Sequence, residues 1–322
     1  MKKVSIKKAF QDPYQMMLLM NNVKKFFLTV LQVAIIVGVS YVILSPVIGM
    51  LVNSFSSDSD AYNPMVFLFP EAPTLERYSL AILRMEYWST MGKNILYVVT
   101  LTAIQVFMCS MVGYGFARFD FPFKKLLFGC VVVMIVIPAY TIKLPLYTTF
   151  RNFDPMGIVT LIKGAPINLM GTPWPIYIMS FLGCGVKAGL YIYIFNQFFR
   201  GLPKEIEEAA FVDGAGMWYT YFNIMLKNAS PAVITVTVFS LVWQFNDAFF
   251  SNLFLVSEDI VISKKIATLQ MVIANEDKIL NVTIQQLYLH AGVIMVLLPI
   301  IIMYLMLQRY FIEGVERSGI VG

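Results

Sequence analysis

The chain has 322 residues, of which 58% are hydrophobic and only 13% are charged, and its formal net charge is +5. A typical soluble domain carries about 25% charged residues, so this composition excludes an ordinary soluble protein and predicts a membrane protein. Basic residues do not cluster with aromatic residues in a polar domain, so nucleic-acid binding is not expected.

Six stretches are long and apolar enough to cross a bilayer, which takes about 20 mainly apolar residues. We therefore expect an all-α, polytopic protein with one membrane domain over residues 26–322, preceded by a polar leader at 1–25. The leader is too long and too polar for a cleavable signal peptide. The predicted transmembrane helices lie at about 26–52, 94–116, 126–150, 174–199, 231–256 and 287–310.

Lysine and arginine are concentrated on one side of these spans, which marks the cytoplasmic side. They lie in the leader, in the short loop around 118–125 and around the segment 200–230. We therefore expect both termini and the segment 200–230 in the cytoplasm. The loops at about 53–93, 151–173 and 257–286 then lie outside, and the first contains RYSLAILRMEYW, which predicts an interfacial helix.

Motifs for catalysis are absent from the sequence. There is no G-x-x-x-x-G-K-[ST] phosphate loop, and no G-x-S-x-G, H-E-x-x-H or C-x-x-C motif. Three dispersed cysteines, Cys109, Cys130 and Cys184, predict neither a disulfide framework nor a metal site. His290 has no acid or nucleophile near it in sequence, so we expect a structural role. The chain is predicted to be a transport component with no catalytic residue, metal or cofactor of its own.

The stretch PKEIEEAAFVDGAG, residues 203–216, is acidic and rich in small residues, unlike the rest of the chain. We expect a short helix with Pro203 as its first residue and three glutamates in its opening turns, where they complement the helix dipole. Ile206, Ala210 and Gly214 follow at spacing four and share one flat face. Gly214 is also able to adopt a positive φ and turn the chain.

A second short amphipathic helix is predicted directly after this stretch, over MWYTYFNIML. Its apolar positions follow the i, i+3, i+4, i+7 spacing of one helix face. These positions are Trp218, Tyr221, Phe222 and Met225. By composition alone, a solvated helix that only joins two spans explains the whole segment equally well.

Spacing in this segment follows the pattern E-A-A, three residues, G, nine residues, I-x-L, from Glu208 to Leu226. It resembles the EAA loop of ABC-importer permeases, although Lys227 stands where that family has proline. The flanking stretches GYGFARFDFPFKK, IPAYTIKLPLYTTF and GVERSGIVG resemble binding-protein-dependent sugar permeases of the maltose-type second subunit. The resemblance covers about residues 26–322, but the loop at 151–173 is longer than is usual in that group.

This resemblance implies a type I ABC importer permease fold in the bacterial inner membrane and a share in a carbohydrate translocation path. It also implies three kinds of partner: a second permease subunit, two cytoplasmic ATPase subunits that bind ATP and Mg²⁺, and an extracytoplasmic solute-binding (lipo)protein. The segment 200–230 is then the coupling loop. Its predicted contacts with the ATPase are Glu208, Ala209, Ala210, Asp213, Gly214 and Ala215.

Polar residues inside an apolar span are costly and mark functional sites. WQFNDAFF, within the predicted fifth span, supplies aromatic and amide groups that suit a polyhydroxy ligand. The alternative is that these groups form hydrogen bonds between helices. The predicted path residues of this stretch are Trp243, Gln244, Asn246 and Asp247.

Two lysines also fall inside predicted spans. Lys143 lies near the outer end of the third span, from which its side chain is able to snorkel to the interface. Lys187 lies deep in the fourth. Both are candidates to face the path and favour an anionic sugar, and the alternative is pairing with an acid of the partner subunit.

Two rival functions remain to be compared with a permease. A stand-alone secondary transporter predicts inverted repeats with discontinuous helices at matched positions, and no internal repeat is found. A membrane-embedded enzyme predicts a catalytic pair or metal set facing a cavity, and His290 without partners argues against it. The identity and charge of the solute stay open, as does the choice between a different permease and a second copy as partner.

Overall fold

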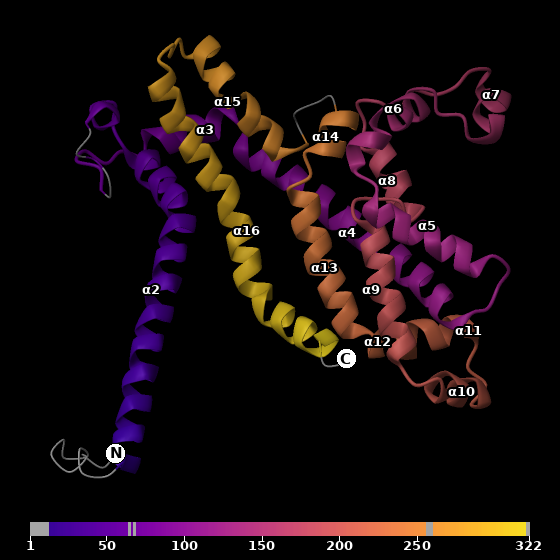
Figure 1. Cartoon of the computed structure of the whole chain (residues 1–322). Helices are drawn as coiled ribbons and strands as arrows, with labels where there is room; N and C mark the ends of the chain where they lie inside the picture. The colour runs from indigo at the N-terminus through magenta and orange to yellow at the C-terminus, as the bar shows by residue number, and fades with distance from the viewer. Residues whose placement is uncertain (1–12, 64–65, 67–68, 256–259, 320–322) are drawn as a thin grey trace.

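The computed structural model describes residues 13–63, 66, 69–255 and 260–319, and its regular structure is helical (Figure 1). Among these residues, the only β-type pairing is an isolated antiparallel bridge between Phe153 and Ile167. The all-α prediction is confirmed. In chain order the helices are α2 (Pro13–Phe55), α3 (Glu76–Arg84), α4 (Tyr87–Arg118), α5 (Lys124–Val136), α6 (Lys143–Arg151), α7 (Ile158–Lys163), α8 (Trp174–Phe181), α9 (Ala188–Gly201), α10 (Glu205–Val212), α11 (Met217–Tyr219), α12 (Leu226–Asn228), α13 (Ser230–Phe245), α14 (Phe249–Phe254), α15 (Ile262–Glu276) and α16 (Val282–Gly319).

Three helices in the described part of the chain are long and apolar enough to cross a membrane alone. They are Met20–Phe55 within α2, Tyr87–Arg118, which is α4, and Val282–Met306 within α16. They match the predicted first, second and sixth spans. Two sharply bent helix pairs raise the possible number to five, so the total of six spans stays a prediction. Residues 1–12 of the predicted leader lie outside the described residues.

The predicted third span, at 126–150, is not one straight helix. α5 ends at Val136, and the chain that follows bends by 107° before it continues into α6. Ile137 is extended, with φ −63° and ψ 123°, because a residue that precedes proline avoids the helical region. Pro138 also has no N–H to donate to the preceding turn. The prediction of a continuous helix here was wrong.

The predicted fourth and fifth spans, at 174–199 and 231–256, are also broken. Between α8 and α9, Gly183 and Lys187 adopt positive φ values of 70° and 57°, which end one helix before the next begins. Between α13 and α14, the Asp247 carboxylate accepts hydrogen bonds from the amides of Phe250 (3.4 Å) and Ser251 (3.0 Å), so it starts a new helix. Residue 256 lies outside the described residues.

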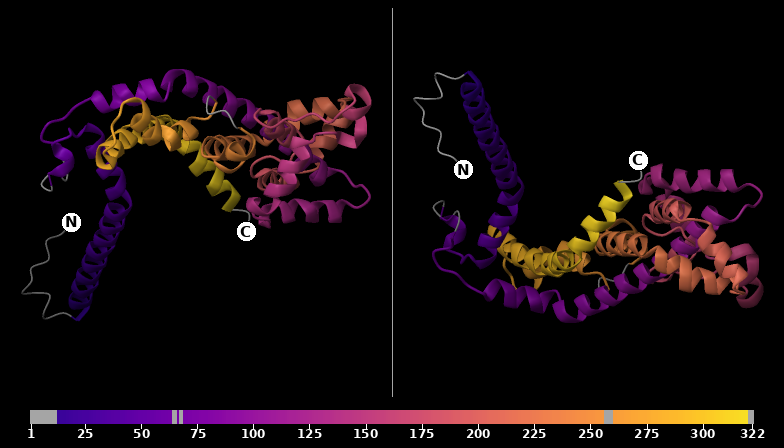
Figure 2. Two further views of the ribbon diagram at one scale, coloured as in Figure 1. Left: turned by 90° about the horizontal axis from the view of Figure 1, so that it is seen from above. Right: turned by 90° about the horizontal axis from the view of Figure 1, so that it is seen from below.

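The elements divide between two ends of the molecule. Helices α10–α12 lie at one end, here called the α10 end, together with the start of α2 and the end of α16 (Figure 1). Helices α3, α6, α7 and α15 lie toward the opposite end, here called the α3 end. From above and below, the helices form a curved row from which α2 projects (Figure 2). Every residue from 21 to 44 in α2 is exposed.

Two clusters of buried side chains hold the row together, and α4 contributes to both. The first lies toward the α3 end and packs α4 against α3, α14, α15 and α16 around Leu101, Phe254 and Ile262. The second lies toward the α10 end and packs α4 against α9 and α13 around Phe195 and Met225. α4 is therefore the central helix of the molecule.

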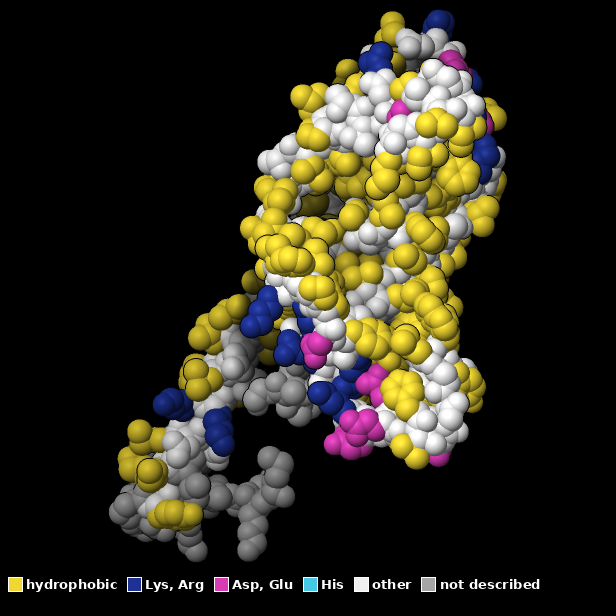
Figure 3. Space-filling view, turned by 90° about the vertical axis from the view of Figure 1, so that its right-hand side faces the viewer, with side chains coloured by type: hydrophobic (Ala, Val, Ile, Leu, Met, Phe, Trp, Pro, Cys, Tyr) yellow, Lys and Arg dark blue, Asp and Glu magenta, His cyan; other side chains and the backbone are white. Residues whose placement is uncertain are grey.

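Side-chain types are distributed along the long axis as a membrane protein requires. On the face in Figure 3, hydrophobic side chains cover the middle, and Lys, Arg, Asp and Glu gather toward the two ends. An apolar middle matches the hydrocarbon core, where a charged side chain is costly.

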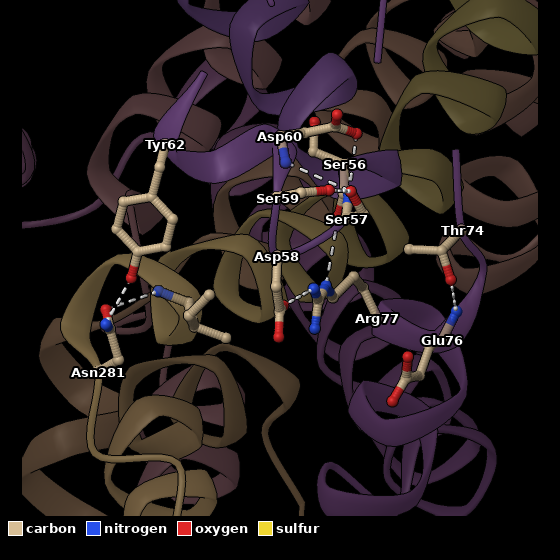
Figure 4. A network of polar contacts seen from close by, with 11 residues as sticks. Ser56, Ser57, Asp58, Ser59, Asp60, Tyr62, Thr74, Glu76, Arg77 and Asn281 are labelled. Atoms are coloured by element: carbon tan, nitrogen blue, oxygen red, sulfur yellow. Dashed lines mark hydrogen bonds and ion pairs between the residues drawn. The ribbon is translucent and has the colours of Figure 1, made fainter. Parts of the chain in front are cut away.

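A polar network at the α3 end joins the segment that follows α2 to α3 and to the residue before α16 (Figure 4). Arg77 of α3 is buried, pairs with Asp58, donates from Nε to the Ser56 carbonyl oxygen at 3.4 Å and lies 4.6 Å from the Tyr288 ring centroid. Burial by itself raises the pKa of Asp60, but hydrogen bonds from Ser57 and Ala72 bring that pKa below its ordinary value. The predicted interfacial stretch is helical over α3, and its contact with lipid stays a prediction.

Close packing of α4 on α9 depends on one glycine. A Cβ atom added at Gly113 would lie 2.6 Å from the Phe195 Cβ and 3.0 Å from the Asn196 amide nitrogen, and both distances are shorter than normal contact. Gly115, two residues further along α4, has open space at the same atom. Small residues at helix crossings let backbones approach in membrane proteins.

We predict that Gly113→Ala destabilises the chain and Gly115→Ala does not. The added methyl at residue 113 forces α4 and α9 apart, and overpacking of this kind costs about 1–3 kcal/mol. In a helix, alanine is otherwise favoured over glycine by about 1 kcal/mol. Thermal unfolding of the purified protein in detergent checks this, with Tm lower by about 2 °C or more for Gly113→Ala alone. Equal Tm values for the two variants contradict the packing assignment.

Candidate functional site

The acidic, small-residue stretch forms α10. The helix begins two residues later than predicted, because the Lys204 carbonyl, and not a residue before it, accepts the first helical hydrogen bonds, from the amides of Glu207 (3.0 Å) and Glu208 (3.1 Å). Pro203 therefore precedes the helix. The acidic first turn is confirmed.

The end of α10 is as predicted at Gly214, whose φ is +82°. The Gly214 amide donates to the Phe211 carbonyl at 3.0 Å, and the Ala215 amide donates to the Ala210 carbonyl at 2.9 Å. These two bonds form a Schellman motif, which needs a left-handed residue at this position. Glycine adopts that conformation without steric cost.

The predicted contact residues of α10 do not all face outward. Glu208, Ala209, Asp213 and Gly214 are exposed, and Ala215 is half-buried. Ala210, in contrast, is only 5% exposed, and Ile206 packs against the second cluster. The face with spacing four is therefore directed at this chain's own helices.

The second predicted helix exists over residues 217–228, but its buried face differs from the prediction. Its central part, Thr220–Met225, is a π-helix, here η4. The wider turn changes which positions share a face. Tyr221 and Met225 are buried as predicted, whereas Trp218 is 62% exposed and Phe222 40% exposed.

Large apolar side chains are exposed at the α10 end, on both sides of the turn at Gly214. Val212 is 87% exposed, although it is the last residue of a helix rich in charged residues. This exposed surface lies in the predicted coupling loop and is here called the coupling surface; it consists of Glu208, Ala209, Phe211, Val212, Met217, Trp218 and Tyr219. Large exposed apolar groups that lie together mark a site of contact with another protein or with a membrane.

A buried ion pair attaches α10 to α4, and sequence reasoning missed it. Arg118 Nε lies 2.7 Å from Glu207 Oε2, and the Tyr114 hydroxyl donates to Glu207 Oε1. The two charged side chains are only 5% and 10% exposed. Arg118 entered the prediction only as a basic loop residue. The spacing of four between Tyr114 and Arg118 was the available signal.

Two predicted path residues from different spans meet at a helix break. Lys187 lies in the break between α8 and α9, and its Nζ is 4.5 Å from the centroid of the Trp243 ring of α13. Both side chains are exposed. A cation over an aromatic face is a favourable contact, and no ion pair involves Lys187 in the described part of the chain.

The other predicted path residues have different environments. Gln244 is buried, and its Nε2 has no hydrogen-bond partner. Asn246 is exposed and donates to the Val242 carbonyl at 2.9 Å. Asp247 lies before α14 and accepts hydrogen bonds from the first turn of that helix, so these bonds are not the contacts between helices stated as the alternative. Lys143 is exposed at the start of α6.

The break next to Lys187 is held by a buried amide that the sequence did not reveal. Gln105 of α4 donates from Nε2 to the Val186 carbonyl at 3.0 Å, and its Oε1 accepts from the Ser240 hydroxyl at 2.8 Å. A Cβ atom added at Gly185 would lie only 2.4 Å from Gln105 Nε2, so this position has no room for a side chain. Gln105 thus joins α4, α13 and the break. In the described residues, no group of three metal-ligating side chains occurs.

Comparison with known families identifies the chain. A family model described as the binding-protein-dependent transport system inner membrane component matches residues 109–316, well over half of the sequence. The chain belongs to this family. The match includes α10, the π-helical segment and both breaks near Lys187 and Asp247. A member of this family is a permease component of an ABC transporter and not an enzyme, since ATP hydrolysis belongs to a separate subunit.

Individual relatives extend over nearly the whole chain. The arabinooligosaccharides transport system permease protein AraQ of Halalkalibacterium halodurans is 25% identical over 88% of this chain and 93% of that protein. The diacetylchitobiose uptake system permease protein NgcG of Streptomyces coelicolor is 23% identical over 88% and 86%.

A solved structure shows the same fold. A chain from the crystal structure of a bacterial ABC transporter involved in the import of the acidic polysaccharide alginate matches with a TM-score of 0.70. The alignment covers 89% of this chain and 98% of that chain, at 19% identity.

Proposed function

We propose that this chain is the membrane-spanning permease subunit of an ATP-driven importer of a carbohydrate, which an extracytoplasmic binding protein delivers. The observation that carries this proposal is the family match over residues 109–316, which includes α10. The names of the relatives AraQ and NgcG, which are both saccharide permeases, support the substrate class.

The coupling surface is the proposed contact with the cytoplasmic ATPase subunits. The chain has no phosphate loop, so the energy of ATP, bound with Mg²⁺ in two such subunits, has to arrive through a protein contact. The coupling surface is apolar, exposed and carried on a helix that buried contacts hold in place. Those properties suit a helix that enters a groove on a partner.

This assignment also orients the chain in the inner membrane. The start of α2 and the end of α16 lie at the α10 end (Figure 1), so an ATPase at that end places both termini in the cytoplasm. The α3 end then faces the binding protein. A second permease subunit packs beside this one in the proposed importer. The proposed type I fold with six spans requires α8 and α9 together to form one more span beside the five that the bent pairs allow.

The sugar path is proposed to pass Lys187 and Trp243. A lysine in the lipid-facing part of a span is costly, so the exposed side chain at this break faces the path or the second permease. An aromatic ring and an adjacent cation together suit a saccharide that carries a carboxylate. Pairing with an acid of the second permease is the competing explanation.

Charge on the coupling surface is expected to abolish import. Ala209→Arg and Val212→Asp each place a charge on an exposed position that meets the ATPase, so ATPase capture and ATP-dependent sugar uptake fall at least about tenfold. Ala210→Arg is less informative, because Ala210 is buried in the chain itself. Co-purification of the ATPase and uptake into membrane vesicles measure the two effects.

Asp120→Asn is the matched control for this experiment. Its side chain is 99% exposed in the loop between α4 and α5, and it is not one of the residues of the coupling surface. Uptake with this variant should equal that of the natural chain. Normal uptake by Ala209→Arg and Val212→Asp chains that insert at normal levels contradicts the coupling assignment.

Lys187→Met tests the charge of the solute. Removal of the cation should lower uptake of uronate-containing oligosaccharides about tenfold and change uptake of neutral oligosaccharides by less than about twofold. Transport assays with both classes, in the fully assembled importer, make the comparison, and Lys143→Met serves as a second removed lysine. An equal loss for acidic and neutral saccharides removes the charge-selectivity proposal.

A further inference from the structure

One face of α4 carries three polar side chains at the α10 end. Ser110, Tyr114 and Arg118 follow each other at spacing four, so they project from the same side of the helix. All three reach residues 202–229, the segment between α9 and α13 that contains the coupling surface and is here called the coupling segment. We refer to these three residues as the α4 clamp.

Arg118 holds the segment before and within α10. Its Nη2 donates to the Leu202 carbonyl at 2.8 Å, and its Nε lies 2.7 Å from Glu207 Oε2. The Tyr114 hydroxyl donates to the second oxygen of the same carboxylate. Both oxygens of Glu207 are therefore occupied in a nearly dry environment, where separation of the charges leaves each one unpaired.

Ser110 holds the segment after α10. Its hydroxyl lies 2.7 Å from the hydroxyl of Tyr221, which is only 2% exposed, in η4. The Tyr114 and Tyr221 rings also contact each other, with centroids 5.1 Å apart. The α4 clamp thus contacts the segment on both sides of the turn at Gly214.

We propose that the α4 clamp makes the coupling segment and α4 move as one body, so that force applied at the coupling surface is transferred to α4. This inference rests on the proposed function, since it assumes that an ATPase acts on α10. α10 has only eight residues and ends in a glycine turn. Without attachment to a long helix, such a segment yields locally under load, because loop segments open at low free-energy cost.

The clamp is formed by positioning residues, which touch neither ATP nor sugar. Two contacts of different kinds form the clamp. One is the Arg118–Glu207 ion pair, and the other is the hydrogen bond between the neutral hydroxyls of Ser110 and Tyr221. Loss of the clamp should therefore leave the coupling surface intact and able to bind the ATPase. What changes is the fraction of ATP turnover that drives import.

Glu207→Gln tests the inference in the complete importer in proteoliposomes. The change keeps the size of the side chain but leaves Arg118 without its counter-ion. We expect uptake per ATP hydrolysed to fall about tenfold, while ATPase co-purification and ATP hydrolysis stay within about twofold of the natural complex. Glu205→Gln, the same chemical change at an exposed position two residues earlier in α10, is the matched control and should keep uptake per ATP unchanged.

Each result of this experiment bears on the inference. A fall in ATPase co-purification, or a proportional loss of hydrolysis and uptake, overturns it and assigns Glu207 a role in folding or docking. Unchanged uptake per ATP also overturns it. If the natural chain and the Glu205→Gln control show no ATP-dependent uptake with their partners, the proposed function itself fails, and that outcome is distinct.

A cross-link tests the same idea in the opposite direction. Cysteines replace Ser110 and Tyr221 in a chain whose Cys109, Cys130 and Cys184 are changed to serine, and a short bifunctional thiol reagent joins them. Replacement of Ser110 and Tyr221 removes their hydroxyl contact, so uptake per ATP hydrolysed should be lower than in the natural chain before cross-linking. Elements that move as one body tolerate a covalent bond between them, so cross-linking should raise this value or leave it unchanged. Loss of uptake on cross-linking, with reversal on cleavage of the reagent, shows relative motion and overturns the inference.

Discussion

Backbone polar groups inside a bilayer must find partners within the protein, and this requirement shapes the whole molecule. Three of the predicted spans are broken, and each break frees backbone groups from the helical ladder. At the break between α8 and α9, the Val186 carbonyl receives its hydrogen bond from Gln105 of α4. At the break before α14, the Asp247 carboxylate accepts a hydrogen bond from the Ser251 amide in the first turn of the new helix. Broken helices persist here because neighbouring side chains replace the missing helical bonds.

α4 is the helix on which these solutions converge. Gly113 lets α9 approach closely. Gln105 donates a hydrogen bond to the backbone in the break between α8 and α9, and the α4 clamp holds the coupling segment. A single unbroken helix therefore touches both the coupling segment and the break that presents Lys187. In an importer, energy arrives at one end and the solute moves past the middle, so a continuous rigid element between the two places is mechanically useful.

The sequence predicts the long, regular parts of this structure well, because about twenty consecutive apolar residues leave few alternatives to a membrane helix. Gly214 was also predictable, since a small acidic helix that ends in glycine specifies its own turn. The breaks were not, because Pro46 and Pro299 lie inside continuous helices whereas Pro138 follows the end of one, and the run around Lys187 is apolar on both sides. Nor was the direction of Ala210, since a small residue suits contact with a partner and with the chain's own core equally well.

Contacts distant in sequence account for the remaining failures, and they carry most of the functional argument. Glu207 is one of four acids in its stretch, and only the fold reveals that it is the one turned inward to Arg118. Trp243 and Lys187 were each candidates for the sugar path on separate grounds, and the fold brings the cation over the ring. Since α4 holds the backbone beside Lys187 through Gln105 and holds the coupling segment through Arg118, a displacement of α4 reaches both sites. In the proposed importer, coupling of ATP hydrolysis to sugar movement then requires no chemistry in this chain, only an α4 helix that stays attached to both sites.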